Sequence, residues 1–143
     1  MADLGTTELS TGVREIDADT ESLCFLMSRI FDPLVECRRQ YGECDRTQCT
    51  RIAAIGKFLD RSFRRQEDLM GQADYPLGED HLADHDTLRL QLAAMREAGV
   101  CADRDRQVVR EALVRWLTRH NRVCDRPLAN WAVTRRLLTP SSP

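Results

Sequence analysis

Apolar residues recur every three or four positions along four stretches of this chain, and this spacing predicts helices. In the clearest stretch, residues 45–71, the inward positions are Ile52, Ile55, Leu59, Ser62, Gln66 and Leu69. A period of 3.6 residues places such side chains on one face of a helix. No stretch alternates convincingly with the period of two that strands show. The chain is therefore predicted to be all-α.

Three further helices are expected at about 17–40, at about 79–98 and from about residue 103 onward. Pro33 is expected to kink the first of them, and Pro127 to bend or break the last, because proline removes a helical hydrogen bond. Gly99 is expected to stop the third helix. Short connections between long helices favour an up-down-up-down four-helix bundle.

The length bounds the architecture to one domain, 1–143, with a core of about 9–131 and a tail of 132–143. Residues 130–138 are expected to continue as helix and residues 139–143 to fray. No apolar run approaches a membrane span, so no membrane association is predicted. The net charge is −2 without a basic block, which disfavours nucleic acid as a partner. The chain starts without a signal-peptide pattern, which predicts a cytoplasmic protein.

Only three histidines occur in the 143 residues, and their positions suggest a metal site. His81 and His85 are four apart and so share a helix face, and His120 lies five residues before Asp125. Three imidazoles and one carboxylate suit zinc or iron. As leftover core polar groups they would leave several buried atoms without partners. We therefore predict that His81, His85, His120 and Asp125 bind a metal ion.

Four motifs in chain order resemble those of the bacterial hemerythrins, over about 9–131. They are TGVREIDADT at 11–20, SFRRQEDLM at 62–70, Tyr75-Pro76 ahead of His81 and His85, and Trp116-Leu117 ahead of His120 and Asp125. The resemblance implies a four-helix bundle that holds two irons. It assigns the three-histidine iron to His81, His85 and His120, and a bridging aspartate to Asp125.

The same resemblance assigns the second iron to positions at which this chain has lost the ligands. The two histidines correspond to Thr20 and Ser62, and the bridging glutamate to Gln66. Hydroxyls and a neutral amide are poor ligands for a highly charged iron pair. The neighbouring Glu67 lies about 100° around the helix from Gln66, so it is not expected to replace it, and Asp68 points away for the same reason.

These losses predict a protein that holds one metal ion, iron or zinc, and does not carry oxygen reversibly. The resemblance places dioxygen at the lost iron, and a small diatomic ligand at the retained ion is kept as an alternative partner. An open metal position could also activate a small molecule. No substrate pocket or general base is identifiable in the sequence, so enzymatic activity is not predicted.

Two alternatives involve the six cysteines, which form no CxxC pair and are expected to be reduced. A degenerate bundle could act as an interaction or thiol redox-sensing module through Cys37, Cys44 and Cys49, which cluster around one predicted loop. A diiron oxygen-binding site could instead use Cys24 and Cys124 as substitute ligands. Burial as small core residues is the simpler interpretation of both. Cys101 is expected in a turn.

Overall fold

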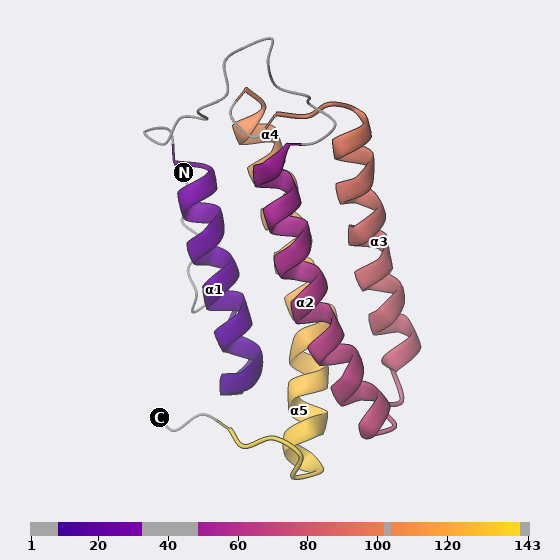
Figure 1. The fold of residues 1–143 in the computed structure, drawn as a ribbon. Coiled ribbons are helices and arrows are strands. Elements are labelled where there is room, and N and C mark those ends of the chain that lie inside the picture. The colour runs from indigo at the N-terminus through magenta and orange to yellow at the C-terminus, as the bar shows by residue number, and fades with distance from the viewer. Residues whose placement is uncertain (1–8, 33–48, 102–103, 141–143) are drawn as a thin grey trace.

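The computed structural model describes residues 9–32, 49–101 and 104–140, and these residues are helical without any strand. Figure 1 shows long helices packed beside one another, as an all-α bundle requires. In chain order the elements are α1 (Arg14–Ile30), α2 (Thr50–Gln72), α3 (Gly78–Glu97), α4 (Arg106–His120), a π-helix (Asn121–Asp125) and α5 (Arg126–Thr134). None of these helices is long and apolar enough to cross a membrane.

The first helix starts earlier than predicted because Asp17 belongs to its first turn. Its carboxylate accepts hydrogen bonds from the backbone N–H groups of Thr11, at 2.7 Å, and Gly12, at 3.2 Å, so it anchors the segment that enters the helix. α1 ends at Ile30, before Pro33, and the predicted kink falls outside the described residues. α2 begins at Thr50, not near residue 45.

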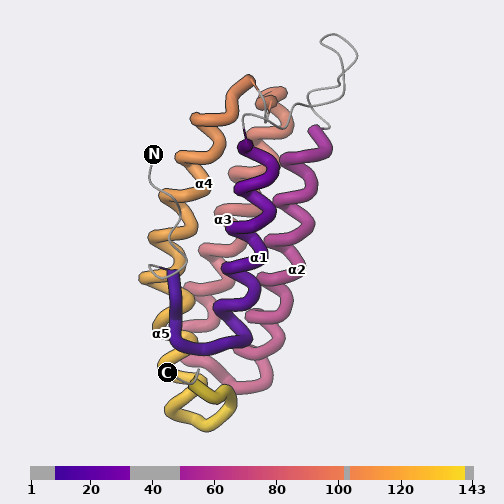
Figure 2. The backbone as a smooth tube through the Cα atoms, turned by 90° about the vertical axis from the view of Figure 1, so that its left-hand side faces the viewer, coloured from indigo at the N-terminus to yellow at the C-terminus, as the bar shows by residue number. Residues whose placement is uncertain are grey.

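The predicted break at Pro127 does not occur, because the preceding π-helix accommodates the proline. The N–H of Arg126 donates to the carbonyl of Asn121, and Pro127 then stands in the first turn of α5, where its missing N–H removes no helical bond. α5 ends at Thr134, short of the expected residue 138, and Pro140 forms an isolated β-bridge with Val13. Figure 2 shows α5 continuing the chain from the lower end of α4. The predicted stop of the third helix is confirmed, with Gly99 at a φ of 69°.

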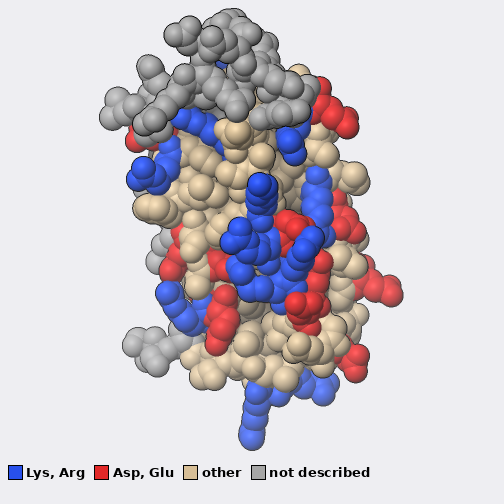
Figure 3. Space-filling model, viewed as in Figure 1, with Lys and Arg blue, Asp and Glu red and all other residues tan. Residues whose placement is uncertain are grey.

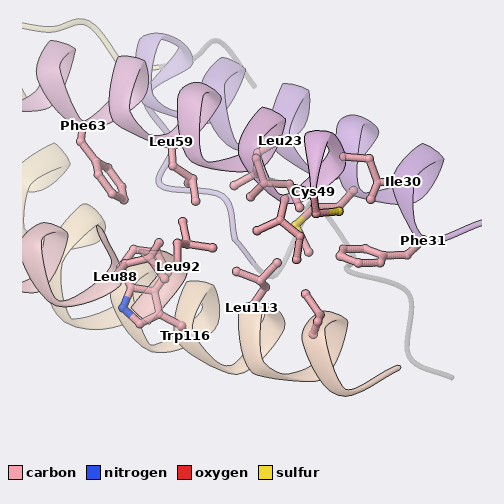
Figure 4. Close-up of a cluster of buried hydrophobic side chains, with 14 residues drawn as sticks. Leu23, Ile30, Phe31, Cys49, Leu59, Phe63, Leu88, Leu92, Leu113 and Trp116 are labelled. Atoms are coloured by element: carbon pink, nitrogen blue, oxygen red, sulfur yellow. The ribbon is translucent and has the colours of Figure 1, made fainter. Parts of the chain in front are cut away.

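The apolar core is divided by a layer of buried polar side chains. The larger part joins α1 to α4 and includes Leu59, Phe63, Leu88, Leu113 and Trp116 (Figure 4). Beyond the polar layer lie two smaller apolar clusters. One consists of Val13, Ile16 and Ala129, and the other of Met70, Tyr75 and Leu128. The buried polar and charged residues are Ser62, Gln66, His81, His85, His120, Asn121 and Asp125.

Surface charges of both signs alternate on the face drawn in Figure 3. Arg65 pairs with Asp19, and Arg89 pairs with Asp60 and Glu67. Such mixed pairs across α1, α2 and α3 contribute little stability individually.

Candidate metal centre

Three imidazoles meet inside the bundle. α3 supplies His81 and His85 from successive turns, and the last residue of α4 supplies His120. One ring nitrogen of each lies within 4.8 Å of those of the other two. The three side chains are 2%, 0% and 3% exposed, so water does not solvate them. This buried cluster could hold a metal ion.

The π-helix brings Asp125 to the same point. In a regular α-helix, residues five apart are rotated by roughly 140° from one another. Here Oδ1 of Asp125 lies 3.0 Å from Nε2 of His120 and 3.5 Å from Nε2 of His81. The wider π turn thus places a carboxylate, 7% exposed, against two of the imidazoles.

Gln66, predicted as a lost ligand position, reaches the centre of the cluster. Its Oε1 lies 2.9 Å from Nε2 of His81 and 3.0 Å from Nε2 of His85. Its amide nitrogen donates to Oδ1 of Asp125 over 3.2 Å. The amide oxygen is therefore a fifth atom that faces the common point of the three histidines and Asp125.

Two carboxylates that the sequence analysis did not assign hold the outer nitrogens of two rings. Oε2 of Glu67 lies 2.8 Å from Nδ1 of His85, and Oδ2 of Asp84 lies 2.5 Å from Nδ1 of His120. Metal-bound histidines usually carry such partners, which orient the ring and strengthen its basicity. The available signal was the helical spacing, since Asp84 is three residues after His81 and Glu67 follows Gln66.

Aromatic rings fix the planes of the same two imidazoles. Phe63 stacks on His85 with centroids 3.9 Å apart at 9°, and Trp116 stacks on His120 at 4.6 Å and 10°. Both aromatic residues belong to the larger apolar cluster (Figure 4). The side of the centre that faces this cluster is therefore apolar and buried.

The hydrogen-bonding roles leave the centre short of a positive charge. A carboxylate only accepts, so Nδ1 of His85 and of His120 must donate to Glu67 and Asp84. In a neutral ring, Nε2 then carries a lone pair and can only accept. Nε2 of His85 faces Oε1 of Gln66, and Nε2 of His120 faces Oδ1 of Asp125, and both oxygens are also acceptors. Turning the Gln66 amide around would only set its oxygen against Asp125. A cation at the common point satisfies every one of these atoms.

Protonation reflects the same imbalance. Burial, together with the neighbouring His81 and His120, lowers the pKa of His85 to about 2, so this ring is neutral. Burial also opposes a charge on His120, but contacts with Asp125, Cys124 and Asp84 outweigh it and raise its pKa to about 10. Burial likewise opposes ionisation of Asp125, but His120 and His81 hold its pKa well below the ordinary range. A metal ion would compete with the proton on His120.

The hydroxyls of Thr20 and Ser62, which stand where the resemblance expects the two histidines of a second iron, are hydrogen-bonded elsewhere. Oγ1 of Thr20 donates to the carbonyl of Ile16 in its own helix, over 3.5 Å. Oγ of Ser62 donates to Oδ2 of Asp19, over 3.2 Å, and Asp19 also pairs with Arg65. A guanidinium therefore neutralises the carboxylate beside these two positions.

The cysteines divide between the core, the site and the part of the chain outside the described residues. Cys49 is buried in the larger apolar cluster, while Cys37 and Cys44 lie outside the described residues. Within the described ranges, the other group that could hold a metal is Asp84, His120 and Cys124, and Cys24 is in neither group.

No protein-family model, curated protein or solved structure matches this chain significantly. The likeness to hemerythrins therefore depends on the sequence motifs alone.

Proposed function

We propose that the chain is a hemerythrin-like protein that binds one metal ion, iron or zinc, through Nε2 of His81, His85 and His120 and the carboxylate of Asp125. The observation that carries this proposal is the convergence of these acceptor atoms on one buried point. The carboxylates behind two of the rings support it, because they leave Nε2 free to bind a metal.

The fold that we propose with it is an up-down-up-down bundle. The short turn at residues 73–77, between α2 and α3, favours antiparallel neighbours. The order of the motifs along the chain supports the same arrangement.

A divalent ion fits the charge of the site. One carboxylate and three neutral imidazoles leave one positive charge on a divalent ion. Glu67 and Asp84 contact two of the rings, and each is also paired with an arginine, Arg89 and Arg119 respectively. Zinc would take the four ligands tetrahedrally, whereas ferrous iron would add Oε1 of Gln66 or a small diatomic ligand.

Reversible oxygen carriage is not part of the proposal. A second iron would need Thr20, Ser62 and Gln66 to act as ligands, and the first two are hydrogen-bonded elsewhere. The amide of Gln66 supplies no bridging charge.

Elemental analysis of purified protein tests this function. One ion per chain is expected in the wild type and in Cys124→Ser, and none in the double variant His85→Ala, Cys124→Ser, in which Cys124 can supply no thiolate to the neighbouring Asp84 and His120. Leu88→Ala is the matched control, because Leu88 is one turn along α3 from His85 and only 2% exposed, but belongs to the larger apolar cluster and offers no metal-binding atom. Leu88→Ala should destabilise the fold by about 2–5 kcal/mol and keep its metal. Two ions in the wild type, or one in the folded double variant, would contradict the proposal.

A further inference from the structure

A second group of metal-binding side chains lies behind His120. Asp84 and Cys124 approach the ring from the Nδ1 side, whereas the proposed centre uses Nε2. Oδ2 of Asp84 is 2.5 Å from Nδ1, and Sγ of Cys124 is 3.8 Å from the same oxygen. The three potential ligand atoms lie within 4.8 Å of one another.

This outer group opens onto a cavity of about 270 Å³, whose lining residues include Asp80, Asp84, His81 and Cys124. His81 is 2% exposed, and no described residue offers a hydrogen-bond partner to its Nδ1. Because Nε2 of the same ring faces Gln66, Nδ1 points away from the inner centre. A buried nitrogen without a partner beside a polar cavity requires a ligand or an ordered water.

We propose that Asp84, Cys124 and Nδ1 of His120 form an outer site for a thiophilic divalent ion such as Zn²⁺, with a water from the cavity as its fourth ligand. That water would also donate a hydrogen bond to Nδ1 of His81, because Nε2 of the neutral ring donates to Oε1 of Gln66. A thiolate, an imidazole and a carboxylate form a donor set that zinc accepts. The proposal does not depend on the inner site.

The geometry requires one small movement. Zinc bond lengths of about 2.3 Å to sulfur and about 2.0 Å to oxygen and nitrogen place tetrahedral ligands roughly 3.3–3.5 Å apart. The sulfur–oxygen distance of 3.8 Å is already close to this. The Asp84–His120 contact must widen, because the ion takes the place of the proton between them. That proton and the thiol proton leave to solvent.

The two sites compete for His120. An ion at the inner site needs a proton on Nδ1 that donates to Asp84, whereas the outer ion needs both atoms as ligands. A neutral imidazole has only one lone pair, so simultaneous binding would require its full deprotonation. We therefore expect the outer site to bind an ion when the inner site is empty. The cavity beside Asp84 and Cys124 gives that ion a route of entry.

Titration of the metal-free protein with Co²⁺ tests the outer site, because thiolate-to-cobalt charge transfer absorbs in the near ultraviolet. The absorption is expected in His85→Ala, which lacks an inner ligand only, so that the inner site no longer competes for His120. It should be lost when Cys124→Ala or Cys124→Ser is added to this variant. Cys49→Ala, added to the same variant, is the matched control, since Cys49 is equally buried but lies in the apolar core.

The result separates the two sites. Absorption that survives in both Cys124 variants, or disappears in Cys49→Ala, would assign the thiolate elsewhere and overturn the outer site. No absorption in His85→Ala would also overturn it, because the outer site would then fail to bind the ion even without competition from the inner site. The stoichiometry of the inner site is measured independently by elemental analysis.

Discussion

At the scale of single residues, the centre is organised by what stands behind each imidazole. Glu67 fixes His85 and Asp84 fixes His120, so both rings present Nε2 inward before any ion arrives. This preorganisation reduces the entropy lost on binding. The third ring, His81, lacks such a carboxylate among the described residues and depends on Gln66 and Asp125 instead.

Substitution of Glu67 by glutamine should weaken metal binding about 10–100-fold, because His85 loses the carboxylate that orients it. The affinity can be measured by competition with a chelator of known strength. The matched control is Asp68→Asn, which removes the same charge from the adjacent, exposed position. Equal affinities in the two variants would show that Glu67 acts only through its charge.

The metal-free protein should be most stable near pH 6.5, the ordinary pKa of an unfolded histidine. The folded pKa of His85 is about 2, so below pH 6.5 the unfolded state binds more protons than the folded state. The free energy of unfolding therefore decreases as the pH is lowered. The folded pKa of His120 is about 10, so its contribution is complete below pH 6.5 and is lost as pH rises towards 10. Melting curves recorded across this range test both the acidic limb, where stability falls below pH 6.5, and the alkaline limb, where it falls above pH 6.5.

A variant separates the two limbs. His85→Asn should flatten the acidic limb and leave the alkaline limb in place. Bound metal should flatten the alkaline limb, because it displaces the proton from His120. An alkaline limb of the same slope with and without metal would mean that His120 is not a ligand.

The sequence was sufficient to predict that the three histidines lie together, but not to predict which side chains form hydrogen bonds with them. Spacing of four put His81 and His85 on one helix face, and the motif order joined them to His120 and Asp125. The central place of Gln66 depends on how closely α2 approaches α3, which no local pattern encodes. Asp84 and Glu67 were missed because a carboxylate near a histidine in sequence need not face it.

At the scale of elements, the π-helix is the feature on which the site depends most. It links α4 to α5, carries Asn121, Cys124 and Asp125 as buried residues, and turns Asp125 towards His120. Asn121 donates from its side chain to the carbonyl of Leu9, over 2.7 Å, which ties the N-terminal segment to this turn. π turns have poorer hydrogen-bond geometry than α turns and commonly occur at functional sites.

Backbone amides of the π-helix should exchange hydrogen faster than those of α4 in the metal-free protein, and metal should slow them. The reason is that His120 and Asp125 flank the turn, so an ion that binds both closes it. Exchange followed by mass spectrometry gives both rates, with Leu88–Leu92 of α3 as an internal reference. Unchanged exchange on metal binding would indicate that Asp125 does not bind the ion.

Helix periodicity predicted the existence of α2, α3 and α4 because each presents buried residues at regular helical spacing, although α2 begins at Thr50 and not near residue 45. The prediction was wrong at both ends of the chain. Asp17 was predicted to start the first helix, but it lies inside the first turn and accepts a hydrogen bond from the backbone that precedes the helix. Pro127 was predicted to bend or break the last helix, but it follows a π turn, in which its missing N–H removes no hydrogen bond. Both outcomes depend on contacts or hydrogen bonds beyond the local pattern of residue types.

At the scale of the whole molecule, the centre links three helices, so metal should stabilise the entire fold. An ion at 100 times its dissociation constant adds about 2.7 kcal/mol to the free energy of unfolding. For 143 residues this raises Tm by roughly 10 °C. Calorimetry with metal and with chelator measures the difference. Superimposable curves would favour a bundle in which the histidines are only core residues.

The relation to hemerythrins can be tested by rebuilding the second half of the site. Thr20→His, Ser62→His and Gln66→Glu together restore every ligand that the motifs assign. Thr20 and Ser62 lie on the facing helices α1 and α2, where the native partners are only a backbone carbonyl and Asp19. Two added imidazoles risk overpacking, which commonly costs about 1–3 kcal/mol, and binding of a second ion should offset this cost. The folded triple variant is therefore expected to bind two irons per chain and to show an oxo-bridged diiron spectrum.

The double variant that keeps Gln66 is the control, and it should bind the second iron much more weakly because no carboxylate replaces the bridging charge. A folded triple variant that still binds one ion would mean that α1 and α2 are not spaced as in hemerythrins, and the assignment of Thr20 and Ser62 would then be wrong.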